Sequence, residues 1–246
     1  MPEGPSIYIT KQAIRPFLKG QVISAARGNA KISMEDLAGK EITDVKSWGK
    51  HLLICLPKLT VRIHFLMWGS YSIDEQIRPD RSLRLQLTAG GKNVFFYTCS
   101  VKLLEGRLND LYDWETDLLN RKWNGAKARK KLKLLPDTMI CDAILDQNIF
   151  AGAGNIFKNE VLYRVKLHPA NKVKDIPPRK LTELVNEVHN YSYDFLKWKK
   201  TFVLKKHWLA HAKRTCQRCE IPLTKKHLGK TDRRTFFCEQ CQVRYG

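Results

Sequence analysis

The sequence predicts a two-domain α+β protein: a β-sandwich behind a leading helix in the first half, then a mainly helical half that ends in a metal-binding finger. Three observations indicate this. Short β-rich runs separated by Gly, Pro, Asn or Asp fill the chain before about residue 112. Helical periodicity dominates after that point. Two Cys-x2-Cys pairs near the C-terminus complete the pattern.

The first half is expected to open with a helix over residues 4–19, because apolar residues share one helical face behind Pro5 and Gly20 can end it. Six strand-like runs follow, at 21–26, 41–48, 51–56, 60–65, 82–87 and 93–98. In the fifth run, Leu83, Leu85 and Leu87 alternate with polar residues, as in a strand with one buried face. These runs are typical of a β-sandwich.

The second half is expected to contain helices over 139–147, 154–163 and 178–198. We divide the chain into an N-terminal β-sandwich domain over 1–118, a basic connection over 119–134, a helical domain over 135–210 and a finger over 211–246. No segment reaches the ~18 apolar residues of a membrane span, and the N-terminus lacks the pattern of a signal peptide. We therefore expect a cytoplasmic, nucleoid-associated monomer with no membrane partner.

The charge of the chain predicts a polyanionic partner. Lys and Arg number 44 against 24 Asp and Glu, which gives a net charge of +20. The excess is concentrated in 121–133 and 197–234, and both stretches also carry aromatic residues. A solvated face or a disordered tail is the alternative, but interspersed aromatics favour ordered nucleic-acid binding.

The two cysteine pairs, Cys216 with Cys219 and Cys238 with Cys241, are separated by 18 residues. This spacing is typical of a site in which four thiolates hold one structural zinc ion. Disulfides or a redox site are the alternatives. Three further cysteines stand singly in apolar surroundings and are expected to be buried: Cys55, Cys99 and Cys141.

Pro2 and Glu3 form a candidate catalytic pair. Removal of Met1 would leave Pro2 with a secondary amine, which can attack an electrophilic sugar carbon and can only form a cationic iminium. Such a cation acidifies the neighbouring C–H group and so couples covalent capture to elimination. A proline that merely suits the first turn of a helix is the alternative.

Four other segments are candidate contact sites. Asp232, Arg233 and Arg234 are expected at the tip of the finger hairpin, where the two arginines could bind phosphate or face solvent. The Gly-rich run 147–156 precedes a helix whose N-terminus could hold a phosphate, although close helix packing also selects glycine. Lys50 lies in a turn between strands and could be an ordinary surface lysine. Leu66, Met67 and Trp68 could replace an extruded base or pack in the core.

In this order, the motifs resemble the formamidopyrimidine-DNA glycosylase and endonuclease VIII family over the whole chain. The resemblance rests on Pro2-Glu3-Gly4-Pro5, Gly49-Lys50, the loop 64–69, the segment 152–156 with Glu160, and the four-cysteine finger ending in Cys241-Gln242. It implies a β-sandwich domain and a helix-two-turns-helix domain with a zinc finger, binding damaged double-stranded DNA as glycosylase and lyase.

The same resemblance implies a role for each candidate residue. Pro2 attacks C1′ of the damaged nucleotide, and Glu3 protonates the ring oxygen and later shuttles protons. Lys50 assists at the lesion, and Arg233 holds phosphates there. Asn155 binds phosphate, and we expect DNA contacts from Leu66, Met67, Trp68 and Arg234. Strand cleavage follows by β- or β,δ-elimination.

Departures from the formamidopyrimidine branch favour the endonuclease VIII branch and oxidised pyrimidines. The loop 64–69 has bulky groups on both sides of Met67, the segment 97–101 replaces a Pro-Arg-Arg-Phe-Gly-like motif, and 193–211 has no Gly-rich insert. The alternatives are the same chemistry on oxidised purines and a non-catalytic binder of DNA lesions. A nuclease that uses metal-activated water is disfavoured, because the sequence offers no convincing carboxylate or histidine cluster.

Overall fold

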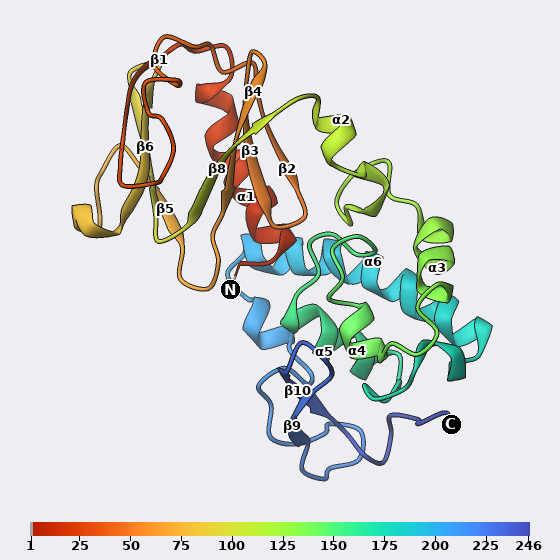
Figure 1. Cartoon of the computed structure of the whole chain (residues 1–246). Helices are drawn as coiled ribbons and strands as arrows, with labels where there is room; N and C mark the ends of the chain where they lie inside the picture. Colours follow the sequence, from red (N-terminus) through yellow and green to blue (C-terminus); the bar gives the residue numbers. More distant parts are fainter. Residues whose placement is uncertain (1) are drawn as a thin grey trace. The chain divides into compact units, whose positions relative to one another are not determined.

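The computed structural model describes residues 2–246, and the chain divides into two compact units. The first ends at Asp113 and the second runs from Trp114 to Gly246. Figure 1 shows β-structure in the first unit, and helices with a terminal hairpin in the second. The predicted α+β fold class is confirmed.

The first unit is a β-sandwich with a leading helix, α1 (Gly4–Leu18), which contacts β2 and β3. One antiparallel sheet has the order β1-β6-β7-β5, and the other has the order β2-β3-β4-β8. The strands are β1 (Ile23–Arg27), β2 (Asp44–Trp48), β3 (His51–Leu56), β4 (Leu59–His64), β5 (Ser70–Ile73), β6 (Leu83–Ala89), β7 (Lys92–Tyr97) and β8 (Ser100–Glu105). A short helix, α2 (Leu108–Leu111), follows.

The core of the sandwich lies between the sheets. The expected alternation in β6 is present: Leu83, Leu85 and Leu87 are buried, and the residues that alternate with them are partly exposed. Leu85 and Leu87 share one apolar cluster with Ile54 and Val61 of the other sheet and with Ile14 of α1. The apolar faces that the two sheets turn toward each other therefore hold the unit together, and the alternation along the strands identifies these faces.

The second unit is mainly helical. Its helices are α3 (Gly125–Lys133), α4 (Ile140–Ala143), α5 (Asn155–Arg164) and α6 (Pro178–Lys200), and its hairpin consists of β9 (Thr224–Leu228) and β10 (Arg233–Phe237). The expected helix 139–147 is wrong in length, because α4 has only four residues and turns follow it. Helix α3 was not expected within the basic stretch; Asn124 Oδ1 caps it by accepting from Lys127 N at 3.0 Å.

Helix α6 supplies much of the core of this unit. Its apolar stripe, including Leu184, Val188 and Phe195, packs with Phe157 and Val161 of α5. This stripe confirms the periodicity expected over 178–198. Across residues 2–246, no helix combines the length and the hydropathy needed to cross a membrane.

Candidate functional site

The predicted catalytic pair lies where α1 begins. Glu3 immediately precedes the first helical turn, its carbonyl oxygen accepts from Ser6 N–H at 2.8 Å, and the residue is 2% exposed. The positive end of the helix dipole favours a carboxylate here. Pro2 is partly exposed, and the expected removal of Met1 falls outside the described residues. A shielded carboxyl group thus lies next to an accessible proline.

Lys50 lies in the two-residue turn that joins β2 to β3. Gly49 adopts a φ of 50°, as the first residue of such a tight hairpin turn does. Lys50 is half-buried. Its charge acts on His64: burial first, then the charges of Lys50 and Arg62, lower the pKa of that imidazole. The turn therefore fixes Lys50 near two strand ends of one sheet.

Beside this turn, four rings pack together. His51 pairs with His64 across β3 and β4, with ring centroids 5.5 Å apart. Tyr112 Oη lies 3.2 Å from His51 Nδ1, and the Tyr112 ring is 4.9 Å from that of Trp48. Trp48 Nε1 donates to the carbonyl of Asp113 at 3.0 Å. This ring cluster ties the Lys50 turn to the end of the first unit.

The ring cluster makes stability depend on pH. Burial, with the positive charges of Arg62, His64 and Lys50, lowers the pKa of His51 from 6.5 to about 3. In the unfolded chain His51 binds a proton below about pH 6.5, whereas in the folded chain it stays neutral down to about pH 3. The free energy of unfolding therefore falls as the pH is lowered through that window.

We expect a His51→Asn variant, which cannot titrate at this position, to lose ~2 kcal/mol less stability than the parent between pH 7 and pH 4.5. Urea denaturation at both pH values measures the difference. Equal losses in the two proteins would show that another group sets the acid sensitivity.

The predicted apolar loop joins β4 to β5. Met67 is 50% exposed and Trp68 is 74% exposed, and Leu66 is also exposed, with a φ of 52°. Phe65 is buried, and its carbonyl oxygen accepts from Gly69 N–H at 2.8 Å. A Cβ on Gly69 would lie 2.3 Å from that oxygen, so only glycine allows this tight turn. Core packing, the alternative reading of the three apolar residues, is excluded by their exposure.

The four predicted ligand cysteines form one cluster, with their Sγ atoms all within 4.8 Å of one another. The sulfurs of Cys216 and Cys241 are 3.7 Å apart. Four sulfurs at ~2.3 Å from a tetrahedral Zn²⁺ lie about 3.8 Å apart, so the geometry fits that ion. Tyr163 Oη is 3.2 Å from Cys216 Sγ, and Tyr163 therefore packs the cluster against α5. The cluster can hold a metal ion.

The remaining cysteines are buried thiols, as expected. Burial raises the pKa of Cys99 to about 12 and that of Cys141 to about 11. Both therefore stay protonated at neutral pH, where they behave as small apolar side chains. Cys55 is likewise buried, and its pKa is raised by burial.

Helix α5 carries the hairpin on polar side chains. The ammonium group of Lys158, a residue only 1% exposed, lies 2.7 Å from Thr235 Oγ1 and 3.3 Å from the carbonyl oxygen of Arg234. Asn155 Nδ2 donates to the same carbonyl at 3.0 Å. The backbone of the predicted arginine pair is therefore anchored to the first turn of α5.

Further along α5, Glu160 fixes the segment that leads into the finger. Its carboxylate is fully buried and accepts hydrogen bonds from the backbone N–H groups of Leu209, Ala210 and His211, at 2.7 to 2.9 Å. Asn159 Oδ1 accepts from Phe236 N–H at 3.2 Å. Hydrogen bonds accepted by a charged carboxylate are stronger than those between neutral groups. The bonds to Glu160 and Asn159 therefore hold the finger to α5.

The expectation that Arg233 and Arg234 lie at the hairpin tip is wrong. Residues 229–232 make the turn, and the two arginines begin β10, where both are exposed. A side chain of α4, that of Asp142, holds this turn in place. Its carboxylate accepts from Lys230 N–H at 2.8 Å, from Thr231 N–H at 3.1 Å and from Thr231 Oγ1 at 2.7 Å. The arginines thus sit between a clamped tip and an anchored strand.

Asp142 is therefore expected to be a positioning residue for the finger. In an Asp142→Ala variant, amide exchange at Lys230 and Thr231 should rise about tenfold, because their N–H groups lose a charged acceptor. Metal content should not change. An Asp137→Ala variant is the control, since Asp137 pairs with Lys174 and does not bond to the turn. Unchanged exchange in Asp142→Ala would show that the turn is stable without the clamp.

The Gly-rich segment before α5 is held by Gln147. Its amide nitrogen donates to the carbonyl of Ala153 at 3.0 Å, and its Oε1 accepts from Gly152 N–H at 3.0 Å. Gly152 has a φ of 105°, a conformation that favours glycine. Gly154, which precedes α5, has no side chain with which to cap the helix. One glutamine thus closes the turn that leads to Asn155.

Within the second unit, the structure brings the four cysteines together into one cluster, and it separately brings Asn155 to the backbone of Arg234. Glu3, Lys50 and the apolar loop all lie in the first unit, at the ends of its helix and strands. Sequence reasoning missed the residues that position these groups: His51, Tyr112, Asp142, Lys158 and Asn159. Asp142 precedes the Gly-rich run by a few residues and could have been noticed there, whereas Lys158 reads as an ordinary surface lysine.

A β-sandwich behind an N-terminal Pro-Glu pair, with a Gly-rich turn and a four-cysteine finger on a helical unit, defines the class of two-domain proteins built like formamidopyrimidine-DNA glycosylase. The sequence pattern of the formamidopyrimidine-DNA glycosylase N-terminal domain matches residues 1–101, and that of its H2TH domain matches residues 117–201. The chain belongs to the formamidopyrimidine-DNA glycosylase and endonuclease VIII family.

Individual relatives agree with this assignment. The chain is 29% identical to mouse Endonuclease 8-like 3 over 98% of its own length, but it spans only 46% of that protein, less than half its length. It is 26% identical to the DNA-(apurinic or apyrimidinic site) lyase Nei2 of Mycolicibacterium smegmatis, over 99% of each chain. In fold, it matches Lactococcus lactis formamidopyrimidine-DNA glycosylase bound to DNA containing an abasic site, with a TM-score of 0.86, 19% identity, and coverage of 98% and 100% of the two chains.

Proposed function

We propose that this chain is a bifunctional base-excision repair enzyme: a DNA glycosylase that removes oxidised bases and a lyase that cuts the strand at the abasic site. The observation that carries the proposal is Pro2 beside Glu3, whose carboxyl group is buried at the start of α1. The family to which the chain belongs and its full-length relative named as a lyase support it.

The covalent step begins at Pro2. Once Met1 is removed, its amine titrates near pH ~8, so a fraction is unprotonated at neutral pH. The lone pair attacks C1′ of the damaged nucleotide, the bond from C1′ to the base breaks, and the base leaves with the bonding electrons. The proline nitrogen, protonated after the attack, first loses its proton to solvent. Glu3 protonates the sugar ring oxygen, and the nitrogen lone pair then forms the C=N bond as the bond from C1′ to the ring oxygen breaks. The ring is open and a cationic iminium joins Pro2 to C1′.

Strand cleavage follows by elimination. The iminium withdraws electrons from C1′, so a base can take a proton from C2′; Glu3 is the proton shuttle of this step. The freed electron pair forms a C2′=C3′ double bond and the C3′–O bond breaks, releasing the 3′ strand with its phosphate. The reaction either stops at this β-elimination or continues by a δ-elimination, in which the C5′–O bond breaks and the remaining sugar is released. The cations of Lys50 and Arg233 hold phosphates at the lesion.

The residues predicted to contact DNA outside the catalytic group bind the duplex in two ways. Leu66, Met67 and Trp68 enter the duplex where the damaged nucleotide leaves it, which their exposure permits. Asn155 at the start of α5 and Arg234 on β10 bind phosphate oxygens. The net charge of +20 supports this partner.

The metal of the finger is one structural zinc ion held by all four cysteines. Four thiolates leave no open coordination position, so the ion contributes fold rather than chemistry. The bound ion would join the cysteines that flank the hairpin, and strand β10 of that hairpin carries Arg233.

Oxidised pyrimidines are the favoured substrates, and oxidised purines are the alternative. Three consecutive bulky residues at 66–68, the segment 97–101 and the short connection after α6 support the endonuclease VIII branch. We assign the catalytic β-sandwich domain to residues 1–118, the basic connection to 119–134, the helix-two-turns-helix domain to 135–210 and the zinc finger to 211–246. The enzyme acts as a monomer on nucleoid DNA.

A cleavage assay tests the function. A duplex with one abasic site, incubated briefly with the chain in EDTA, should be cut on the 3′ side of that site. Salt-sensitive binding without cleavage would instead identify a non-catalytic lesion binder. A panel of duplexes carrying oxidised pyrimidines or 8-oxoguanine then ranks the substrates. Faster excision of 8-oxoguanine would overturn the pyrimidine assignment.

A further inference from the structure

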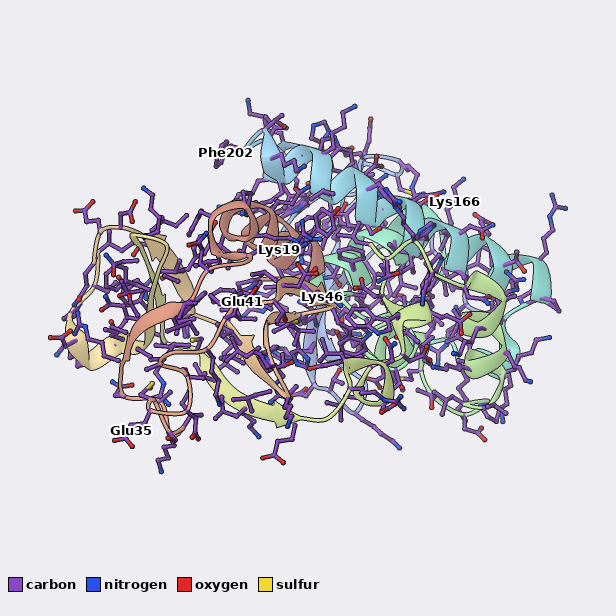
Figure 2. All side chains as sticks on the ribbon, turned by 90° about the horizontal axis from the view of Figure 1, so that it is seen from above. Lys19, Glu35, Glu41, Lys46, Lys166 and Phe202 are labelled. Atoms are coloured by element: carbon purple, nitrogen blue, oxygen red, sulfur yellow. The ribbon has the colours of Figure 1, made fainter. Side chains whose placement is uncertain are left out.

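The end of α6 presents an aromatic ring to solvent. Phe202, the second residue after the helix, is 93% exposed, the largest exposed fraction among the large apolar side chains described. Figure 2 shows its side chain projecting away from the ribbon at the end of α6. Burial in the core of the second unit therefore does not explain a phenylalanine at this position.

The local backbone does not explain it either. Phe202 N–H donates to the carbonyl of Lys199 at 3.3 Å, and Val203 N–H donates to that of Trp198 at 2.9 Å. These two bonds make a Schellman motif, in which the residue at the position of Phe202 adopts a left-handed conformation and is usually glycine. Phe202 has a φ of 60°, which is strained for an aromatic residue. Glycine would end this helix with less strain.

The chain around the ring is strongly basic. Lys199, Lys200, Lys205 and Lys206 lie within four residues of Phe202, all exposed, and no Asp or Glu occurs between residues 195 and 219. The segment is also ordered: Trp198 and His207 stack with centroids 4.2 Å apart and planes 5° from parallel. An aromatic face is thus displayed on a fixed, cationic support.

We propose that Phe202 is a stacking site for an unpaired nucleobase, whose flanking phosphates are bound by these four lysines. Any base has a π-face that can stack on an exposed ring, and the phosphates require cations on both sides of it. A paired base offers no free face except at a duplex end, so the site selects unpaired nucleotides. It lies wholly within the second unit, whereas the apolar loop 66–68 belongs to the first.

This inference extends the proposed DNA-repair function, but it is tested without the repair chemistry. Binding of an undamaged, fluorescently labelled single-stranded oligonucleotide and of a covalently closed circular duplex, which has no ends on which the ring could stack, is measured for the parent and for Phe202→Gly. Loss of the ring should weaken single-strand binding about fivefold or more and duplex binding less than twofold. Thermal stability should stay equal or rise, because glycine relieves the left-handed strain.

Two further variants complete the test. Phe202→Trp should retain single-strand binding, because the larger ring also stacks. Tyr193→Ala should change nothing, since Tyr193 is an exposed aromatic on the same helix that lies beside Asp194. Unchanged binding in Phe202→Gly, or equal losses for single strand and duplex, would overturn the proposal, as would failure of Phe202→Trp to retain binding. These outcomes stand apart from abasic-site cleavage, which tests the proposed function itself.

Discussion

Replacing Cys238 with serine is expected to release the metal and unfold the finger. Because a site of this kind forms only in the folded chain, its binding free energy, ~10 kcal/mol or more for zinc-finger peptides, is also folding free energy. Cys238 follows directly after β10, the strand that begins with Arg233 and Arg234. We therefore expect metal content to fall from one ion per chain to near zero and duplex affinity to fall at least tenfold.

Elemental analysis and duplex titration measure these two effects. Cys141→Ser is the matched control, because Cys141 is a buried thiol of the same unit that lies outside the cluster. That change should lower stability slightly and leave the metal in place. Full metal content in Cys238→Ser would remove Cys238 from the ligand set, and lost metal with unchanged affinity would separate the finger from DNA binding.

Blocking the amine of Pro2 is expected to abolish covalent capture of DNA. Inserting one N-acetylated alanine before Pro2 turns its nitrogen into an amide, which has no available lone pair and cannot form an iminium, and leaves no free α-amine at the N-terminus. With an abasic-site duplex and borohydride, the parent should give a reduced adduct that runs as a larger species. The blocked chain should give none, and its strand cleavage should fall by orders of magnitude.

A Pro2→Gly variant with a free N-terminus is the control for this experiment. Its primary amine can still form a Schiff base, so part of the adduct should persist. Zinc content and binding of undamaged duplex should match the parent in both proteins, because both changes lie in the first unit and the four cysteines belong to the second. An adduct of normal yield from the blocked chain would show that another amine is the nucleophile.

Much of the fold follows from patterns along the chain. Leu83, Leu85 and Leu87 of β6 alternate because one face of the strand is buried between sheets. Strands β5 and β8 were missed for the corresponding reason. Both lie at sheet edges, and the four residues Ser70–Ile73 are all only partly buried, so no alternation marks them. Helix α3 was hidden because only Ala128 and Leu132 of its nine residues are buried.

The candidate site divides in a similar way. The cluster of four cysteines could be predicted, because their spacing carries chemistry that few other roles require. Pro2 and Glu3 stay a prediction made on the same ground. Residues that hold these groups could not. Lys158 and Asn159 are polar, yet they are buried against β10. Their role depends on a hairpin more than seventy residues away in sequence. Such contacts leave no periodic signal.

Peptide mapping of the reduced adduct identifies the nitrogen that attacks DNA, and we expect it to be that of Pro2. The parent chain is trapped on an abasic-site oligonucleotide with borohydride, digested with nuclease and trypsin, and analysed by tandem mass spectrometry. We predict that the sugar remnant lies on the peptide 2–11, at the Pro2 nitrogen. A remnant on a lysine, such as Lys50, with an unmodified Pro2 would show that a lysine, and not Pro2, is the nucleophile.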